Sequence, residues 1–510
     1  MIHYNMPTKV KIHGSCGHRF KSVKEAFTQS IEEKKEVGAS FAVMIDGEYV
    51  IDIYGGYKDT EKTQPWENDT ICNVFSTTKV PTALCTMMCV DRDLLDLDEK
   101  VSKYWPEFAQ GGKENISVRH ILSHSSGLAG IDEPIPWSAW YDWNRIIKLL
   151  EVQKPWWEPG TKSGYHGFTQ GYLLGELVKR VTGKSLGTFF KEEIANPLNI
   201  DFYIGLPEDQ IPCVSNLIPA RSSGEEISLI FGYITEIANK SERIKKEIEK
   251  LEKYIEFEFV DQEIFGMTIS NNKITIDNKK LEKSPDYKFT IAKETSAIIL
   301  SLFSPFNNEA EIVSSNMKVE GDSEDIKLIK KLFEIIANEV RTSGSLVLRQ
   351  LLNPINYVDI SIRSSERLWQ NSEIPAANGH GNARSVAKIA SIIACGGEIN
   401  NIRLLSAETI EKMLEEQIYD TDLIVLVPIR WGLGVALSGK IISFPNDRTC
   451  FWQGAGGSGI IMDLDNKIGI GYVMNQMRNQ PLSETLSNKF LSDTRGNRLV
   501  TAVYESLGLI

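Results

Sequence analysis

The chain has 510 residues, of which 42% are hydrophobic and 24% charged, which is the composition of an ordinary globular protein. This length exceeds what one compact core usually contains and predicts two or three domains. The net charge of -12 argues against a nucleic-acid partner, because binding to phosphates requires a basic surface.

The N-terminal segment and the cysteines bear on location and on metal binding. Residues 1–20 contain no apolar run of the length found in a secretory signal, and no stretch approaches the roughly 18 uninterrupted apolar residues of a membrane span. The seven cysteines are scattered without Cys-x-x-Cys spacing, so we expect reduced thiols and a cytoplasmic location. The alternative, a metal site, would have to use His3, His13, Cys16 and His18, whose spacing fits no zinc template. We therefore expect no metal and no cofactor.

Two hairpins, one near each end of the chain, are predicted from apolar runs and their turns. Asp46-Gly47 joins the first pair of runs, and Asp-Gly suits a type I′ turn because both central residues need a positive φ. Asp465-Asn466 joins the second pair. A helical pattern over 20–37 precedes the first hairpin, and an amphipathic stretch over 482–507 follows the second. Both termini are therefore predicted to build one antiparallel sheet covered by helices.

The region between the hairpins is predicted to be mostly helical, with a separate unit inserted into it. Helices are predicted over 78–93, 118–124, 143–153, 168–181, 382–395 and 406–417. Residues 222–345 differ in composition and read as a small inserted α+β domain, which leaves 1–221 and 346–510 as the main domain. Within the insertion, helices are predicted over 244–254, 295–303 and 324–340, and strands over 255–260, 267–269, 274–276 and 287–291, while the segment 317–322 precedes the last helix.

The motif Ser-x-x-Lys occurs four times, as Ser76/Lys79, Ser270/Lys273, Ser315/Lys318 and Ser385/Lys388. Ser270 falls in a predicted turn, Ser315 in a loop of the insertion, and Ser385 in an amphipathic helix whose Lys388 should face water. Ser76 instead opens a helix behind a strand-like run, where Lys79 shares its face and the free N–H groups favour an oxyanion. Taken alone, the motif favours the simpler interpretation of Ser76 as a helix N-cap.

Two later features favour the catalytic interpretation of Ser76. Tyr165 lies in Gly164-Tyr165-His166-Gly167, just before a predicted helix, where a phenol could reach the serine. Trp452-Gln-Gly-Ala-Gly-Gly-Ser458 precedes a strand, and its glycines allow a backbone N–H to approach a substrate carbonyl. Each feature alone could be a core tyrosine or a flexible loop. The occurrence of all three in this order points to acyl-transfer chemistry.

Phe75-Ser-Thr-Thr-Lys79, Tyr165-His-Gly167 and Trp452-Gln-Gly454 resemble the signature elements of class C β-lactamases, D-Ala-D-Ala peptidases and especially family VIII carboxylesterases. The resemblance covers about 1–221 and 346–510. It implies an α+β fold like that of β-lactamases and penicillin-binding proteins, in which an antiparallel sheet is flanked by helices beside a mostly helical region.

The same resemblance implies roles for individual residues. Ser76 would be the nucleophile, and Lys79 and Tyr165 would share the base and acid roles, with the first base left open. The oxyanion would lie on the backbone N–H groups of Ser76 and Ala455. The expected substrate-binding residues are Trp452, Gly454, Gly167 and His380.

Two departures from the class C pattern bear on the substrate. Gly167 stands where an Asn amide recognises β-lactams, and Trp452 stands where a Lys attracts a substrate carboxylate. Both favour a neutral ester, and we expect a small-molecule, hydrophobic carboxylic ester as the substrate. An acyltransferase, a β-lactamase or D-amino peptidase, and a non-enzymatic lipid-binding protein are the alternatives. A Ser-His-Asp triad is not expected, because no Gly-x-Ser-x-Gly elbow accompanies His124, His166 or His380.

The inserted segment, over 255–340, resembles the sterol carrier protein fold. That resemblance implies an apolar tunnel that could present a lipid-like acyl chain to Ser76, or a surface for homo-oligomer formation. The alternative is an ordinary α+β insertion that only packs against the main domain.

Overall fold

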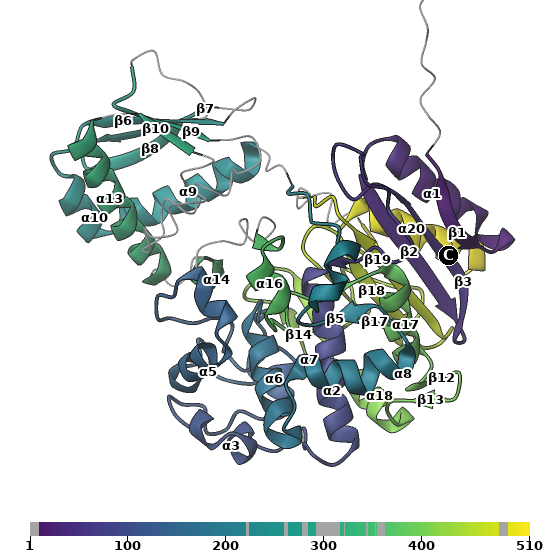
Figure 1. The fold of residues 1–510 in the computed structure, drawn as a ribbon. Helices are drawn as coiled ribbons and strands as arrows, with labels where there is room; N and C mark the ends of the chain where they lie inside the picture. The colour runs from purple at the N-terminus through teal and green to yellow at the C-terminus, as the bar shows by residue number, and fades with distance from the viewer. Residues whose placement is uncertain are drawn as a thin grey trace, which may run out of the picture. The chain divides into compact units, whose positions relative to one another are not determined.

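The computed structural model describes residues 10–220, 224–259, 264–277, 284–291, 317–320, 322–342, 345–351, 353, 363–478 and 488–510. The chain separates into two compact units (Figure 1). The larger unit contains Met1–Ala129, Trp140–Ile218 and Ser364–Ile510, and the smaller unit contains Gly130–Ala139 and Pro219–Arg363. The predicted insertion, residues 222–345, falls within the smaller unit, and its limits as a domain stay a prediction.

A nine-stranded antiparallel sheet forms the centre of the larger unit, in the order β1-β3-β2-β19-β18-β17-β16-β15-β14. The strands are β1 (Ile12–Cys16), β2 (Gly38–Ile45), β3 (Glu48–Gly56), β14 (Ile418–Thr421), β15 (Pro428–Trp431), β16 (Ala436–Leu437), β17 (Thr449–Gln453), β18 (Gly459–Asp463) and β19 (Ile468–Met474). Strands β2 and β19 are neighbours, with Val43 opposite Ile470. Both hairpins and the joining of the two chain ends in one sheet are therefore confirmed. In the first hairpin, Asp46 and Gly47 have φ values of 50° and 82°, as a type I′ turn requires.

Helices cover both faces of this sheet (Figure 1). On one face, α17 (Ala383–Ala394) lies so close to β19 that a Cβ on Gly471 would come within 2.4 Å of the Ala383 carbonyl oxygen. On the other face, α20 (Thr494–Leu507) packs against the Tyr472 ring, 3.0 Å from a Cβ built on Gly496. Because side chains alternate along β19, its small residues face α17. Helix α20 also contacts α1 (Lys21–Glu32).

The C-terminal helix is shorter than predicted. Of the predicted stretch 482–507, residues 488–493 are not helical and 482–487 lie outside the described residues. Asp493 explains where α20 begins, because its carboxylate accepts hydrogen bonds from the backbone N–H groups of Arg495 and Gly496.

The rest of the larger unit is mostly helical, as predicted. Its helices include α2 (Lys79–Asp91), α3 (Val101–Tyr104), α4 (Val118–Leu122), α5 (Trp143–Val152), α6 (Thr169–Thr182), α7 (Leu186–Phe190), α8 (Asn196–Leu198), α16 (Arg367–Asn371) and α18 (Ala407–Met413). Helix α2 is buried from Lys79 to Cys89, so it forms the centre of this region. A small sheet contains β4 (Cys72–Asn73), β11 (His380–Gly381) and β5 (Phe202–Tyr203), of which β4 lies just before α2 in the chain, and β12 (Glu398–Ile399) pairs with β13 (Ile402–Arg403).

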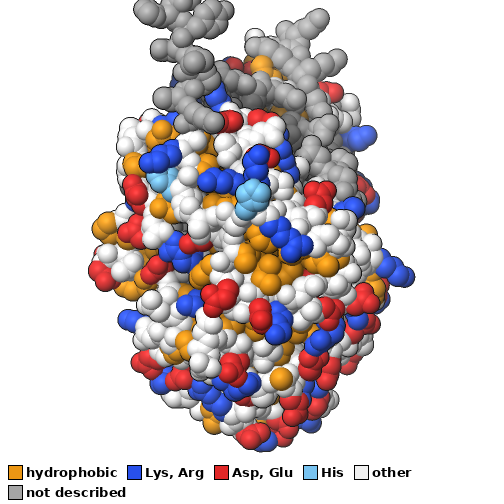
Figure 2. Space-filling view, turned by 90° about the vertical axis from the view of Figure 1, so that its right-hand side faces the viewer, with side chains coloured by type: hydrophobic (Ala, Val, Ile, Leu, Met, Phe, Trp, Pro, Cys, Tyr) orange, Lys and Arg blue, Asp and Glu red, His pale blue; other side chains and the backbone are white. Residues whose placement is uncertain are grey.

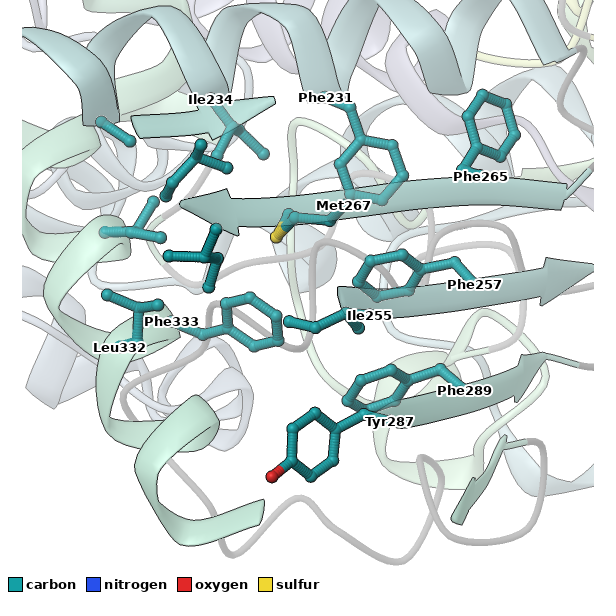
Figure 3. Packing of buried hydrophobic residues seen from close by; sticks show 14 of the residues in the cluster. Phe231, Ile234, Ile255, Phe257, Phe265, Met267, Tyr287, Phe289, Leu332 and Phe333 are labelled. Carbon is teal, nitrogen blue, oxygen red and sulfur yellow. The ribbon is translucent and has the colours of Figure 1, made fainter. Parts of the chain in front are cut away.

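The smaller unit contains a five-stranded sheet in the order β10-β9-β6-β7-β8. Its elements are α9 (Gly224–Lys240), α10 (Glu242–Ile248), β6 (Lys253–Phe259), β7 (Ile264–Ser270), β8 (Lys273–Asp277), β9 (Tyr287–Ile291), β10 (Met317–Glu320), α13 (Ser323–Thr342) and α14 (Leu346–Leu351). Strands β6 and β9 are parallel. Figure 3 shows Phe231 of α9 and Phe333 of α13 packed against one face of the sheet, where they meet side chains such as Phe257 of β6. The ring centroids of Phe257 and Phe289 lie 5.1 Å apart.

The predicted elements of this unit need two corrections. Helix α9 is missing from the sequence prediction, although Phe231, Ile234 and Ala238 show the spacing of a buried helical face. The predicted helix over 244–254 is wrong at its end, because α10 stops at Ile248 and Tyr254 already pairs with Thr268 in the sheet. The predicted helix over 295–303 lies outside the described residues.

Charge is not segregated on the face of the molecule shown in Figure 2. Acidic and basic side chains are interspersed there, with hydrophobic side chains gathered between them. Among the described residues, none of the helices combines the length and the apolar character needed to span a membrane.

Candidate active site

Ser76 lies in a short 3-10 turn, Phe75–Thr78, that leads directly into α2. The strand before it is only Cys72–Asn73, shorter than the strand-like run in the sequence. Phe75 has a φ of 43°, which is unusual for a bulky residue and marks a constrained turn. Thr78, not Ser76, occupies the N-cap of α2, so the capping alternative for Ser76 is wrong.

The Ser76 hydroxyl instead contacts two proton-carrying groups. Its Oγ lies 3.3 Å from Lys79 Nζ and accepts a hydrogen bond of 2.6 Å from the Tyr165 hydroxyl. All three residues are buried. The structure therefore brings together the three residues that the sequence singled out, although 89 positions separate Ser76 from Tyr165.

Lys79 is held by neutral partners. Its Nζ donates to the carbonyl oxygens of Gly167 at 2.6 Å and Ala376 at 2.8 Å, in addition to its contact with Ser76. Burial lowers the pKa of Lys79 well below its ordinary value of 10.5. A lysine held in this way can be a neutral amine at working pH and can accept a proton from a hydroxyl.

Tyr165 lies in the loop before α6, as predicted. Lys79 Nζ is 4.7 Å from the centre of its ring, and the Trp452 indole N–H lies 3.4 Å from its hydroxyl oxygen. Its ring also packs against those of Trp452, at 5.1 Å, and His124, at 5.1 Å. The phenol thus contacts aromatic rings as well as Ser76 and Lys79.

Two residues that hold Tyr165 were missed by the sequence analysis. The buried Asp422 carboxylate accepts a hydrogen bond from the Tyr165 backbone N–H at 3.0 Å and one from the Trp431 indole at 3.3 Å. The Trp431 ring lies parallel to that of Tyr165, with an interplanar angle of 2° and a centroid distance of 6.4 Å. The same carboxylate binds the backbone N–H groups of Ile424 and Val425. No motif in the sequence indicates this cluster, because it joins segments more than 250 positions apart.

The Gly-rich segment connects two central strands. Trp452 belongs to β17, and Gly454 to Ser458 form the turn that leads into β18. Ala455, the expected oxyanion donor, is in this turn. A Cβ on Gly454 would come within 2.2 Å of the Val74 carbonyl oxygen, so only glycine fits where the turn meets the segment carrying Ser76.

The three histidines of the larger unit's interior are held neutral by burial. The His166 backbone N–H donates to His124 Nδ1 at 3.0 Å, and His166 Nε2 is 2.7 Å from the Ser126 hydroxyl. Burial lowers the pKa of His124 well below 6.5, that of His166 to about 3 and that of His380 to about 4. His380, an expected substrate-binding residue, lies in β11 opposite Asn73, and its Nδ1 is 2.8 Å from the Asn378 carbonyl oxygen.

Two of the other Ser-x-x-Lys matches, at Ser270 and Ser385, lie in different surroundings. Ser270 is the last residue of β7. Ser385 donates to Asn382 Oδ1 at 2.8 Å, and Lys388 donates to the Leu198 carbonyl at 2.6 Å, so the expectation that Lys388 faces water is wrong. Ser315 lies outside the described residues. Within the described part of the chain, no group of three or more His, Cys, Asp or Glu side chains is arranged as a metal site.

The comparisons with known proteins agree with this fold. A solved family VIII carboxylesterase is similar with a TM-score of 0.69 and 28% identity, covering 98% of this chain and 100% of that chain. The esterase/beta-lactamase LipL of Mycobacterium tuberculosis is 34% identical over 203 residues, which are 40% of this chain and 47% of LipL. The acyltransferase mokF of Monascus pilosus is 29% identical over 164 residues, which are 28% of this chain and 40% of mokF.

This chain spans about half the length of the curated esterase relatives that it matches. The family model described as Beta-lactamase matches residues 23–222 and 336–490, which together make up more than half of the chain. The predicted α+β fold of β-lactamases and penicillin-binding proteins is thereby confirmed. The chain belongs to the Beta-lactamase family.

Proposed function

We propose that this protein is a serine hydrolase that cleaves neutral, hydrophobic carboxylic esters through an acyl-enzyme on Ser76. The observation that carries the proposal is the position of the Ser76 hydroxyl between a buried lysine amine, at 3.3 Å, and a phenol, at 2.6 Å. A serine hydroxyl is a weak nucleophile by itself, and it needs a nearby group that takes its proton as the new bond forms.

In the proposed reaction, Ser76 Oγ bonds to the ester carbonyl carbon while its proton passes to the Lys79–Tyr165 pair. The oxyanion lies on the backbone N–H groups of Ser76 and Ala455. When the C–O bond to the alcohol breaks, the same pair returns the proton to the leaving oxygen. A water molecule then repeats these steps to release the acid and restore Ser76. Either Lys79 or Tyr165 can take the first proton in this scheme.

The proposed preference for neutral esters rests on the surroundings of the Tyr165 hydroxyl. The Trp452 indole contributes an N–H near this oxygen, but no positive charge that would attract a substrate carboxylate. Gly167 has no side-chain amide, and its carbonyl oxygen accepts a hydrogen bond from Lys79. We also propose that Trp452, Gly454, Gly167 and His380 line the substrate site.

Hydrolysis of p-nitrophenyl esters, with nitrocefin as the comparison substrate, tests the proposal. We expect ester turnover that is lost in Ser76→Ala, and little or no turnover of nitrocefin. Ser270→Ala is the matched control, because Ser270 belongs to another Ser-x-x-Lys match and lies at the end of a strand in the smaller unit. Ester turnover that survives Ser76→Ala would refute the proposal.

Acyl transfer to an alcohol is a second candidate, favoured by the similarity to mokF, an acyltransferase. Both reactions use the same acyl-enzyme, and they differ only in the molecule that removes the acyl group. Adding a primary alcohol during p-nitrophenyl ester turnover separates them: a transferase forms the new ester as the main product, whereas a hydrolase forms mainly the free acid.

Further proposals concern the smaller unit and the location of the protein. We propose that the unit binds a lipid-like acyl chain or supports a homo-oligomer, and that the protein is cytoplasmic. All seven cysteines are free thiols in the structure. Titration with a fluorescent fatty acid measures binding of an acyl chain, and light scattering measures the oligomeric state. The absence of saturable fatty-acid binding would contradict the lipid proposal.

A further inference from the structure

We infer that Ser458 is a positioning residue that fixes the distance between the two backbone segments of the oxyanion hole. This inference rests on the proposed ester hydrolysis, in which the backbone N–H groups of Ser76 and Ala455 bind the oxyanion. The two groups belong to separate parts of the chain, the turn before α2 and the turn between β17 and β18. A contact between these two turns is therefore needed to keep the two N–H groups at a constant distance.

The Ser458 hydroxyl makes that connection. It donates a hydrogen bond of 2.7 Å to the Val74 carbonyl oxygen, two residues before Ser76. Its oxygen is also 2.9 Å from Thr77 Oγ1, the hydroxyl of the residue that follows Ser76. A hydroxyl has one proton, so Ser458 uses it for Val74 and accepts the proton of Thr77. Ser458 thus binds the Ser76 turn on both sides of the nucleophile.

The Gly-rich turn is closed by its own backbone. The Gly454 N–H donates to the Ser458 carbonyl at 2.8 Å, and the Gly457 N–H donates to the Gly454 carbonyl at 3.1 Å. Ala455 lies inside this closed loop, so a change in the position of Ser458 also shifts Ala455. The 2.2 Å that would separate a Gly454 Cβ from the Val74 oxygen shows how closely the two turns meet.

A second anchor holds the far side of the same turn. The Gly456 carbonyl accepts a hydrogen bond of 2.9 Å from the Arg495 guanidinium, which is itself buried between the carboxylates of Glu36 and Asp493. A Cβ on Gly457 would come within 2.7 Å of Asp493 Oδ2. With one side attached to α20, the turn can keep the Ala455 N–H aimed at the oxyanion only if the Ser76 side is attached as well.

The consequence for catalysis follows from the geometry of oxyanion holes. The donors stabilise the transition state when they lie about 2.7–3.1 Å from the oxyanion, and loss of one donor lowers kcat by about 10²–10³-fold. Removing the Ser458 hydroxyl leaves both N–H donors in the chain, but the distance between them is no longer fixed. We expect Ser458→Ala to lower kcat by about 10–100-fold, a part of the full effect, with KM changed by less than about threefold.

The test compares Ser458→Ala, Thr77→Val and Thr77→Ser with wild type in p-nitrophenyl ester turnover. Thr77→Val keeps the shape but removes the hydroxyl, so it should lower kcat in the same way, whereas Thr77→Ser keeps the hydroxyl and should restore most of the activity. Thr86→Val is the matched control, because Thr86 is a buried threonine on α2 whose hydroxyl bonds the Thr82 carbonyl. Its kcat should equal that of wild type.

A trifluoromethyl ketone and the matching methyl ketone give a readout that a merely structural role would not move. The trifluoromethyl ketone forms a tetrahedral adduct with the serine and places an oxyanion between the two donors. Its inhibition constant should rise in Ser458→Ala by about the same factor as kcat/KM falls, while the methyl ketone binds unchanged.

Three outcomes would overturn the inference: an unchanged kcat, a loss confined to KM, or equal weakening of both ketones. Failure of the proposed function is a separate result, namely that wild type shows no ester turnover dependent on Ser76. Thermal unfolding of each variant identifies any that lost activity by unfolding. If Ser458→Ala unfolds, Thr77→Val alone decides between these outcomes.

Discussion

Among the residues that the structure describes, no carboxylate hydrogen-bonds the Lys79 amine beside Tyr165. The amine is bound by two carbonyl oxygens and the Ser76 hydroxyl, and it is buried beneath the phenol ring. Such an environment disfavours the ammonium form, because burial removes water without supplying a counter-charge. The pKa of Lys79 is lowered accordingly. Its proposed role as a base depends on this neutral form.

The pH profile of kcat/KM tests that dependence. We expect activity to fall as the pH drops through the lowered pKa of Lys79, because protonation removes the base. Lys79→Met should reduce kcat by about 10²–10⁴-fold, the usual contribution of a positioned acid–base group. Lys79→Arg should be equally impaired, since a guanidinium stays charged at every accessible pH. An arginine variant that kept the wild-type rate and profile would contradict the proposed role.

At the scale of elements, the Tyr165 loop depends on a segment far along the chain. Asp422 binds the Tyr165 backbone and orients Trp431 against the phenol ring, so it acts through Tyr165 without touching Ser76. We expect Asp422→Asn to lower kcat by about tenfold or more, because an amide places a donor where either Trp431 or a backbone N–H needs an acceptor. Ester kinetics measure this effect. Asp420→Asn is the control, because Asp420 is exposed and pairs with Lys162. Equal rates in the two variants would contradict the positioning role.

The close packing of α17 on β19 gives an element-scale prediction for stability. Gly471→Ala should lower the free energy of unfolding by about 1–3 kcal/mol, because the new methyl group would meet the Ala383 carbonyl oxygen at 2.4 Å. Gly232→Ala, on an exposed position of α9 where the added Cβ meets nothing within 4 Å, should instead stabilise by about 0.5–1 kcal/mol. Urea unfolding measures both changes. A Gly471→Ala variant as stable as wild type would contradict this prediction, because it would show that α17 can shift away from β19 without loss of free energy of unfolding.

The elements that the sequence predicted well are those with a local signal. Asp46-Gly47 specifies its own turn, and the buried stretch of α2 carries an apolar pattern over three turns. Helix α10 was extended too far because the Lys/Glu-rich pattern continues past Ile248, whereas cross-strand pairing of Tyr254 decides where the sheet begins. Asp422 and Trp431 could not be predicted, because their contacts with Tyr165 depend on the pairing of distant segments. The motif residues themselves identified Ser76, Lys79 and Tyr165, and the fold brings them together.

At the scale of the whole molecule, the buried histidines couple stability to pH. The pKa values of His166, about 3, and His380, about 4, lie below the ordinary value of 6.5. Below about pH 6.5 the unfolded chain therefore binds protons that the folded chain excludes, so the free energy of unfolding decreases as the pH falls towards the folded-state pKa values. Each such histidine lowers the free energy of unfolding by up to about 1.4 kcal/mol per pH unit over this window.

Urea unfolding between pH 7 and 5 measures this loss of stability. The slope should become shallower by about one proton in His380→Asn, in which the amide can still donate to the Asn378 carbonyl oxygen. Identical slopes for the variant and wild type would contradict the assignment of a buried neutral histidine at this position.

The central claim is that Ser76 carries the acyl group, and covalent labelling tests it most directly. Treatment of the full chain with a fluorophosphonate, followed by proteolysis and mass spectrometry, should place the label on Ser76 with loss of ester hydrolysis in proportion to labelling. Ser76→Ala should remain unlabelled. A label on another residue, or full ester hydrolysis by a protein labelled at Ser76, would contradict the account.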